Sequence, residues 1–334
     1  MPKNIGINMI VLLISNQEMK KGVIGNPVML RMHDALLADY RVDEVLMQGC
    51  KNPLKDTRIL RNKARAADVI HIHFGGMYAL IVWVLLMGIK KPKLITFHGT
   101  DIHAKTIRTA KSWKAKVRIR LNQWASFFCI IVFDRVGFVA SDMLEYVPKN
   151  LEKLILKKSF IQKLGVDYHL FTIVEKKDAQ RLLNLEQGFK YILFSDISGS
   201  SIKRRDIAMK ITKQLGSEYR LNIMSGVNPN EVPLFINASD FLLLTSDEEG
   251  SPNIIRECLS LNKPVFSVNV GDAKKQIEGL KNSSIISRDE IEAANTIKKV
   301  EALPYTDNTR TARQNVLDMN FIIKEVISIY QELA

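Results

Sequence analysis

The amino-acid sequence predicts an α/β protein of two domains, each built on a doubly wound parallel sheet. The chain has 334 residues, which is more than one hydrophobic core usually supports. Several short apolar runs show no polar alternation, as is typical of strands buried on both faces. Segments with the apolar spacing of helices separate these runs, an order that favours a parallel sheet covered by helices.

The first domain is expected to span residues 1–165. It opens with a buried strand over residues 5–15, a loop that contains Gly22 and Gly25, and a helix over residues 26–38. Further strands, separated by helical stretches, are predicted within "VDEVLMQ", "ADVIHIHF", "KLITFH" and "RVGFVAS". In such a doubly wound sheet, ligands bind at the carboxyl ends of the strands.

The second domain is expected to span residues 166–310, because the alternation restarts after Gly165-Val166-Asp167. Its strands are predicted within "YILFSD", "YRLNIMSG", "FLLLTS" and "PVFSVNV". The remaining residues, 311–334, have helical spacing and are predicted to form a terminal helix.

The composition of the chain indicates which kinds of partner it binds and in which kind of cellular compartment it works. The 48 basic and 35 acidic residues give a net charge of +13, which favours anionic partners. No nucleic-acid-binding motif is recognised in the sequence, so nucleic acid is not expected. Cys50, Cys129 and Cys258 lack the spacing of metal ligands or of a disulfide framework, which favours a reducing compartment. The longest apolar run, residues 77–89, is shorter than the roughly 20 residues that cross a bilayer.

Residues 102–133 form an unusually basic segment with no acidic residue and seven Lys or Arg. On a helix, one apolar stripe would carry Trp113, Val117, Leu121, Trp124 and Phe128, flanked by Lys114, Lys116, Arg118 and Arg120. This pattern predicts an interfacial helix that rests on an anionic membrane surface. The alternative is a helix packed on its own sheet with a solvated basic face.

The clearest functional motif lies in residues 245–272, "TSDEEGSPNIIRECLSLNKPVFSVNVGD", which predicts a loop, a helix and a strand after a buried strand. Gly250 lets the backbone approach a ligand closely, and Pro252 suits the first helical turn. Free N–H groups at the helix N-terminus then make an anion site. Glu257 leans back towards that site, and Glu249 precedes it, so each can meet a hydroxyl of the same ligand.

A nucleotide sugar has this combination of phosphate and hydroxyl groups, and the motif therefore predicts one as the ligand. The alternative is that the acidic residues 247–249 only complement the helix dipole.

These residues also resemble a known family. Glu249-x7-Glu257 resembles the signature of retaining GT-B glycosyltransferases, especially glycosyltransferase family 4. The segments "VPLFINASDFLLLTS", "KLGVDYHLF" and "LITFHGTDIH" resemble other family segments in the same order, so the resemblance covers most of the chain. It implies two Rossmann-like domains facing one cleft, with residues 311–334 packing back on the first domain. The first domain would bind the acceptor, and the second the nucleotide sugar.

The resemblance also implies roles for single residues. His98 and Glu249 would be catalytic; the donor would be bound by Lys203, Arg204, Gly250, Ser251, Asn253 and Glu257; and the acceptor or cleft loop would contain His73, Gly75 and Asp101. For His98 a structural role is the alternative, and Asp101 either caps the following segment or binds a hydroxyl. His71 and His73 have no third ligand at a spacing that would suit zinc.

The segment "SGSSIKRRD", residues 198–206, resembles the family loop that holds the donor diphosphate. Lys203 matches the family lysine, and Asp206 matches the downstream aspartate. The usual arginine is absent, since Asp196-Ile197 stand at its position, and Arg204 or Arg205 is the candidate substitute. The alternative is a solvated basic turn.

The sequence therefore predicts a retaining hexosyltransferase at the cytoplasmic face of the cell membrane. Its acceptor is expected to be a lipid-linked glycan in cell-surface polysaccharide synthesis. The resemblance implies no cofactor and no obligatory metal. Two alternatives stay open: a GT-B-fold sugar-nucleotide epimerase, and a non-catalytic partner of an active glycosyltransferase.

Overall fold

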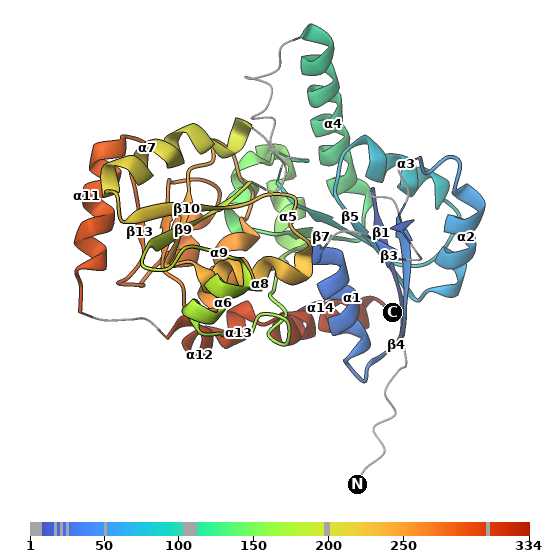
Figure 1. Ribbon diagram of the computed structural model, residues 1–334. Coiled ribbons are helices and arrows are strands. Elements are labelled where there is room, and N and C mark those ends of the chain that lie inside the picture. Colours follow the sequence, from blue (N-terminus) through green and yellow to red (C-terminus); the bar gives the residue numbers. More distant parts are fainter. Residues whose placement is uncertain are drawn as a thin grey trace. The chain divides into compact units, whose positions relative to one another are not determined.

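The computed structural model describes residues 9–16, 19–20, 23–24, 27–49, 52–99, 101–102, 112–196, 201–304 and 308–334 (Figure 1). The chain divides into two compact units, Met1–Leu164 with Met319–Ala334, and Gly165–Asp318. Parts of several predicted elements lie outside the described residues: residues 5–8 of the first strand, Gly22, Gly25 and Asn26, residues 103–111 of the basic segment, and residues 198–200.

The first unit is built on a six-stranded parallel sheet of order β4-β1-β5-β6-β7-β8. Its strands are β1 (Met9–Ser15), β4 (Val42–Gly49), β5 (Val69–His73), β6 (Lys93–Phe97), β7 (Arg135–Phe138) and β8 (Ser159–Ile161), beside the short antiparallel pair β2 (Met19–Lys20) and β3 (Val23–Ile24). Its helices are α1 (Pro27–Leu37), α2 (Thr57–Ala66), α3 (Met77–Leu85), α4 (Trp113–Val132), α5 (Glu152–Lys158) and α14 (Met319–Leu333), with 3-10 turns η2 (Ser141–Tyr146) and η3 (Lys149–Leu151).

Both faces of this sheet are covered, which explains its continuous apolar strands. Leu12, Ile14, Ile70 and Ile72 lie in the core that the sheet forms with α2, α3 and α4. The opposite face packs on α1 and α14, and Tyr330 of α14 is fully buried there. The terminal helix is therefore part of the first unit.

The second unit is built on a five-stranded parallel sheet of order β10-β9-β11-β12-β13. Its strands are β9 (Lys190–Ser195), β10 (Tyr219–Met224), β11 (Phe241–Leu244), β12 (Val265–Ser267) and β13 (Ser284–Ile285). Its helices are α6 (Lys176–Leu182), α7 (Arg205–Leu215), α8 (Val232–Ala238), α9 (Asn253–Ser260), α10 (Ala273–Ile277), α11 (Glu290–Glu301), α12 (Thr309–Ala312) and α13 (Gln314–Leu317), with 3-10 turns η4 (Ser201–Lys203) and η5 (Pro229–Glu231).

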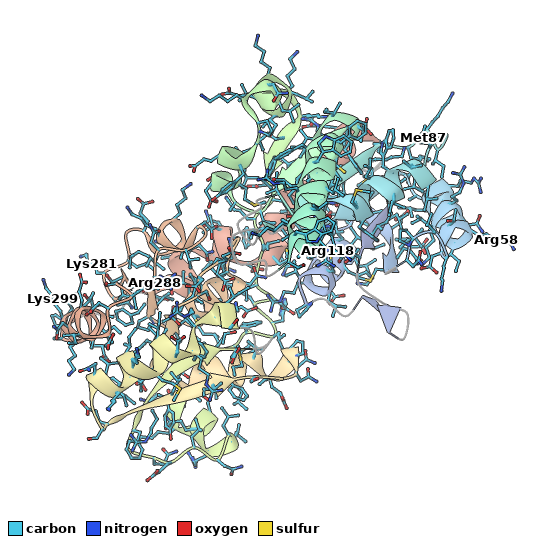
Figure 2. All side chains as sticks on the ribbon, turned by 90° about the horizontal axis from the view of Figure 1, so that it is seen from above. Arg58, Met87, Arg118, Lys281, Arg288 and Lys299 are labelled. Atoms are coloured by element: carbon cyan, nitrogen blue, oxygen red, sulfur yellow. The ribbon has the colours of Figure 1, made fainter. Side chains whose placement is uncertain are left out.

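The predicted fold class, two parallel sheets covered by helices, is confirmed by these topologies. Long charged side chains such as the labelled Arg58 on α2 and Lys299 on α11 are exposed on their units (Figure 2). The unit boundaries fall after Leu164 and Asp318, whereas the sequence placed them after residues 165 and 310. The second difference has a packing reason: α12 and α13 pack on α9 of the second unit, so the terminal helix begins only at Met319.

Candidate active site

The residues of the Glu-x7-Glu segment form a strand, a loop and a helix in the second unit. β11 is buried along its whole length, and α9 begins at Asn253 after the loop 245–252. The loop that follows β12 approaches closely: Gly271 has φ +51°, and a Cβ at Gly271 would lie 2.3 Å from the Gly250 carbonyl oxygen. Only glycine fits there, so the two loops hold each other at the carboxyl edge of the sheet.

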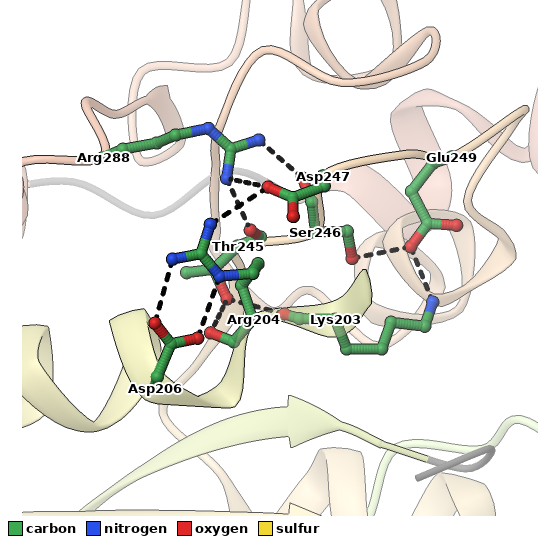
Figure 3. Close-up of polar contacts among 8 residues, drawn as sticks. All are labelled: Lys203, Arg204, Asp206, Thr245, Ser246, Asp247, Glu249 and Arg288. Carbon is green, nitrogen blue, oxygen red and sulfur yellow. Dashed lines mark hydrogen bonds and ion pairs between the residues drawn. The ribbon is translucent and has the colours of Figure 1, made fainter. Parts of the chain in front are cut away.

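Lys203 and Glu249 are in direct contact in this loop cluster (Figure 3). Lys203 Nζ lies 2.6 Å from Glu249 Oε1, and Ser246 Oγ donates to the same oxygen at 2.8 Å. Thr245 Oγ1 donates to the carbonyls of Lys203 and Arg204, at 3.0 Å each, which ties the turn before α7 to the end of β11. Because β9 and β11 are neighbours in the sheet, the loops after them meet at one edge.

Arg204 lies at the N-terminus of α7 with a left-handed backbone, φ +54°. Its guanidinium makes two bonds of 2.9 Å to the Asp206 carboxylate and one of 3.3 Å to Asp247. This contact holds the pKa of Asp206 below its ordinary value. Arg205, the other candidate substitute for the family arginine, is exposed. A positive φ in a non-glycine residue is costly and is often kept at functional sites.

Arg288 is a site residue that the sequence analysis missed. Its guanidinium lies 3.0 Å from the Asp247 carboxylate and donates to the Thr245 carbonyl at 3.0 Å and the Ser246 carbonyl at 2.8 Å. Its position just after β13, at a strand's carboxyl end, is the signal that could have found it. Asp247 and Glu249 thus both pair with basic side chains from other loops, and both also lie just before the N-terminus of α9.

Ser251 is held by a buried charged pair beneath the loop. Its hydroxyl donates to Asp272 Oδ2 at 2.8 Å and accepts from Arg256 Nη2 at 2.5 Å. Arg256 and Asp272 lie 3.3 Å apart, and Gln276 Nε2 donates to the other Asp272 oxygen at 2.7 Å. Glu257, on the same helix as Arg256, is also buried. These contacts set the position of the loop at the start of α9.

In the first unit, Asp101 ties together the loops that follow β5 and β6. Its carboxylate accepts hydrogen bonds from the backbone N–H groups of Gly75 at 2.8 Å, Gly99 at 2.8 Å and His98 at 3.0 Å. Burial raises the pKa of this carboxyl, and the backbone donors oppose that shift. Gly75 has no room for a side chain, because a Cβ would lie 2.2 Å from the Phe97 ring. Asp101 therefore braces both loops.

Three histidines lie close together on β5 and β6: His71 in the middle of β5, His73 at its carboxyl end, and His98 just after β6. His73 Nδ1 lies 3.1 Å from His98 Nε2, and Phe74, with φ +71°, stacks on the His98 ring at a centroid distance of 4.2 Å. His71 is fully buried and bonds to Tyr330 Oη at 2.5 Å and to Thr96 Oγ1 at 2.7 Å. Within the described ranges, no three His, Cys, Asp or Glu side chains come together as a metal site.

These histidines stay uncharged over a wide pH range. Burial lowers the pKa of His71 to about 3 and that of His98 to about 4. The pKa of His73 is lowered well below its usual value, mainly by burial and then by the repulsion that a protonated His71 or His98 ring would add. At neutral pH each ring therefore offers one N–H donor and one acceptor nitrogen.

We expect His71 to make the protein sensitive to acid. In the unfolded chain its pKa is about 6.5, so between pH 6.5 and its folded value of about 3 the unfolded state binds the extra proton. The contribution of the neutral His71 ring to the free energy of unfolding is therefore fully present above pH 6.5 and is lost as pH falls. The free energy of unfolding of His71→Gln should therefore change about 2 kcal/mol less between pH 7 and pH 5 than that of the wild type.

Urea unfolding at both pH values measures this difference. His169→Gln is the control, because His169 is exposed. Equal pH dependence of the wild type and His71→Gln would show that protonation of His71 does not limit stability in acid.

The predicted site residues group by unit. His73, Gly75, His98 and Asp101 lie together in the first unit, whereas Lys203, Arg204, Glu249, Gly250, Ser251, Asn253 and Glu257 lie in the second. The structure thus places a histidine cluster and a cluster of paired charges at the carboxyl ends of two separate sheets.

No protein-family model matches the chain, and no curated protein matches it in sequence. Solved structures do match over nearly the whole length. Sucrose-phosphate synthase of Thermosynechococcus elongatus has a TM-score of 0.74 at 15% identity, over 98% of this chain and 99% of that one. HepE of Anabaena, solved with UDP and glucose, has a TM-score of 0.70 at 15% identity, over 98% and 100%. A glycosyltransferase of Rickettsia africae has a TM-score of 0.69 at 15% identity, over 98% and 99%. These likenesses show that the chain has the GT-B fold.

Proposed function

We propose that the chain is a retaining glycosyltransferase that moves a hexosyl group from a nucleotide-diphosphate sugar to a lipid-linked acceptor. The contact of Lys203 with Glu249 at the start of α9 is the observation that carries the proposal. It puts a cation, a carboxylate and a helix N-terminus at the carboxyl edge of a parallel sheet, the arrangement that a sugar diphosphate requires. HepE, a protein of the same fold, has been solved with UDP-glucose, which supports such a donor.

Each polar group has a part in the proposed reaction. The N–H groups at the start of α9 and Lys203 offset the negative charge of the departing diphosphate, so that no obligatory metal is needed. Glu257 binds ribose hydroxyls, and Glu249 and His98 bind hydroxyls of the transferred sugar. The bond from the anomeric carbon to the phosphate oxygen breaks while the acceptor oxygen bonds to that carbon on the same face. The acceptor proton passes to the departing phosphate.

The basic segment supports the proposed class of acceptor. A lipid-linked glycan, as used in cell-surface polysaccharide synthesis, would bring the first unit to the inner face of the cell membrane. The cations of α4 support this placement, because an anionic leaflet would compensate them.

Glu257→Gln is expected to weaken UDP binding about tenfold. A carboxylate accepts hydrogen bonds from ribose hydroxyls more strongly than an amide does, by about the 1.4 kcal/mol that corresponds to tenfold. Isothermal titration calorimetry with UDP measures the effect. Glu292→Gln on α11 is the control, since Glu292 is exposed. Equal affinities of the wild type and Glu257→Gln for UDP would show that Glu257 is not part of the donor site.

The transfer itself is tested with a panel of nucleotide sugars and a polyprenyl-diphosphate-linked saccharide. Product analysis by NMR should show the anomeric configuration of the donor, and an inverted product would contradict the proposed mechanism. An isomerised nucleotide sugar released without acceptor would identify an epimerase instead. A protein that binds no nucleotide sugar would be a non-catalytic partner, in line with the missing family arginine.

A further inference from the structure

Only the second half of α4 is packed into the first unit. Its buried residues are Ala125, Ser126, Cys129 and Ile130, and no residue from Trp113 to Trp124 is buried. Ser112 caps the helix by accepting the N–H of Ala115. The first three turns, Trp113–Trp124, are called the free half of α4 below. Figure 1 shows this part of α4 standing out from the sheet of its unit.

The rotation of the free half about its axis is set by two hydrogen bonds at its end. Asn122 Oδ1 accepts the N–H of Met77 at 3.0 Å, and Gln123 Nε2 donates to the Ile102 carbonyl at 3.2 Å. Ala115 and Ile119, on the same side as Asn122 and Gln123, are half-buried. The opposite side of the helix is therefore held away from the unit.

That outward side carries four large apolar residues. Trp113 is 71% exposed, Val117 46%, Leu121 54% and Trp124 60%. At about 100° per residue they fall within an arc of about 80°. The unit thus presents a continuous apolar stripe to the solvent, and such stripes mark interaction sites.

Four cations border this stripe. Lys114 and Arg118 lie along one edge, and Lys116 and Arg120 along the other, when the same rotation per residue is applied. All four are exposed, and Figure 2 labels Arg118 on this helix. Lys114 Nζ lies 5.9 Å from the centre of the Trp113 ring. No acidic residue occurs anywhere in α4, so the helix itself supplies no counter-charge.

We propose that the free half of α4 docks the protein on an anionic lipid leaflet, with the stripe at the headgroup boundary and the cations among the headgroups. The free half continues a helix whose second half is packed, but its own outward side gains no stability from packing, so a partner that covers the stripe would stabilise it. A second copy would bring four further cations against these four, whereas anionic lipid compensates them. Tryptophan rings suit the boundary, because they have an apolar body and a polar N–H.

The docking rests on the surface of the bilayer. In the described part of the chain, no helix combines the length and the hydropathy that crossing a membrane requires. This inference goes beyond the transfer reaction, since docking needs neither donor nor acceptor. Its failure would therefore leave the proposed donor site and transfer step untouched, and would withdraw only the support that α4 gives to a lipid-linked acceptor.

Vesicle flotation tests the proposal with the full chain. We expect binding to vesicles of phosphatidylcholine with phosphatidylglycerol, little binding to phosphatidylcholine alone, and weaker binding as salt rises. Because each cation near an anionic leaflet contributes about fivefold in affinity, Lys114→Glu with Arg118→Glu should weaken binding by about thirtyfold or more. The matched control is Lys210→Glu with Lys213→Glu on α7, which makes the same change in net charge at exposed positions.

A second variant, Trp113→Ala with Trp124→Ala, tests the stripe without changing the charge, and it should also weaken binding. Hydrogen exchange should slow at amides of residues 117–121 only when anionic vesicles are present. Circular dichroism and urea unfolding of every variant show whether the fold is intact. Equal binding to neutral and anionic vesicles, no binding to either, or equal loss in the α7 control would overturn the proposal. So would self-association that the tryptophan variant abolishes.

Discussion

Replacing Lys203 with methionine is expected to reduce the rate of sugar transfer by about 100-fold or more. Lys203 Nζ is the group that contacts Glu249, at 2.6 Å, beside the N-terminus of α9. In the proposed reaction it faces the diphosphate, whose negative charge grows as the sugar leaves. Removing one such preorganised electrostatic group commonly costs about 10²- to 10³-fold in kcat. The loss also leaves the Glu249 carboxylate with Ser246 Oγ but without its cation.

Initial rates at saturating donor measure this effect, so that weaker donor binding is separated from slower chemistry. Lys210→Met on α7 is the matched control, because Lys210 is an exposed lysine of the same unit. Lys203→Arg keeps the charge in a longer, planar group and should recover part of the rate. If Lys203→Met transfers sugar within about threefold of the wild-type rate, the diphosphate is held elsewhere.

The second large effect is expected for stability. Replacing Asp272 with asparagine should lower the free energy of unfolding by about 3–5 kcal/mol. The side chains of Arg256 and Asp272 are only 8% and 9% exposed, so water cannot compensate a lone charge. Asparagine keeps the size of the side chain but leaves the Arg256 guanidinium buried without its carboxylate. Ser251 would lose the same partner, so the donor loop should loosen as well.

Urea unfolding of the single and double variants separates the pair from its surroundings. Adding Arg256→Met to Asp272→Asn should recover much of the stability, since no buried charge then remains. Asp178→Asn is the control, because Asp178 pairs with Arg181 at an exposed position, where such pairs contribute about 1 kcal/mol or less. If Asp272→Asn lowers the free energy of unfolding as little as this control does, the buried pair of Arg256 and Asp272 does not stabilise the loop before α9.

Sequence patterns over short distances predicted the β11–α9–β12 unit well. The apolar run 241–244 and the helical spacing from Asn253 are local properties, and each element forms where they indicate. Gly250 and Glu257 were likewise placed by their distance along the chain from the helix start. The terminal helix was expected from residue 311 but begins at Met319, because the pattern of residues 311–318 does not reveal that they pack on α9.

The sequence by itself determined the two parallel sheets and the edge of each at which polar residues gather, because these follow from apolar period and strand order. Only the tertiary structure decided which polar groups pair. Lys203 and Glu249 are 46 residues apart, and they meet because β9 and β11 are neighbours. Arg288 reaches Asp247 from the loop that follows β13, and the Asp101 carboxylate accepts N–H groups from two loops. Such pairings depend on the direction of side chains across a sheet edge, and spacing along the chain carries no information about that direction.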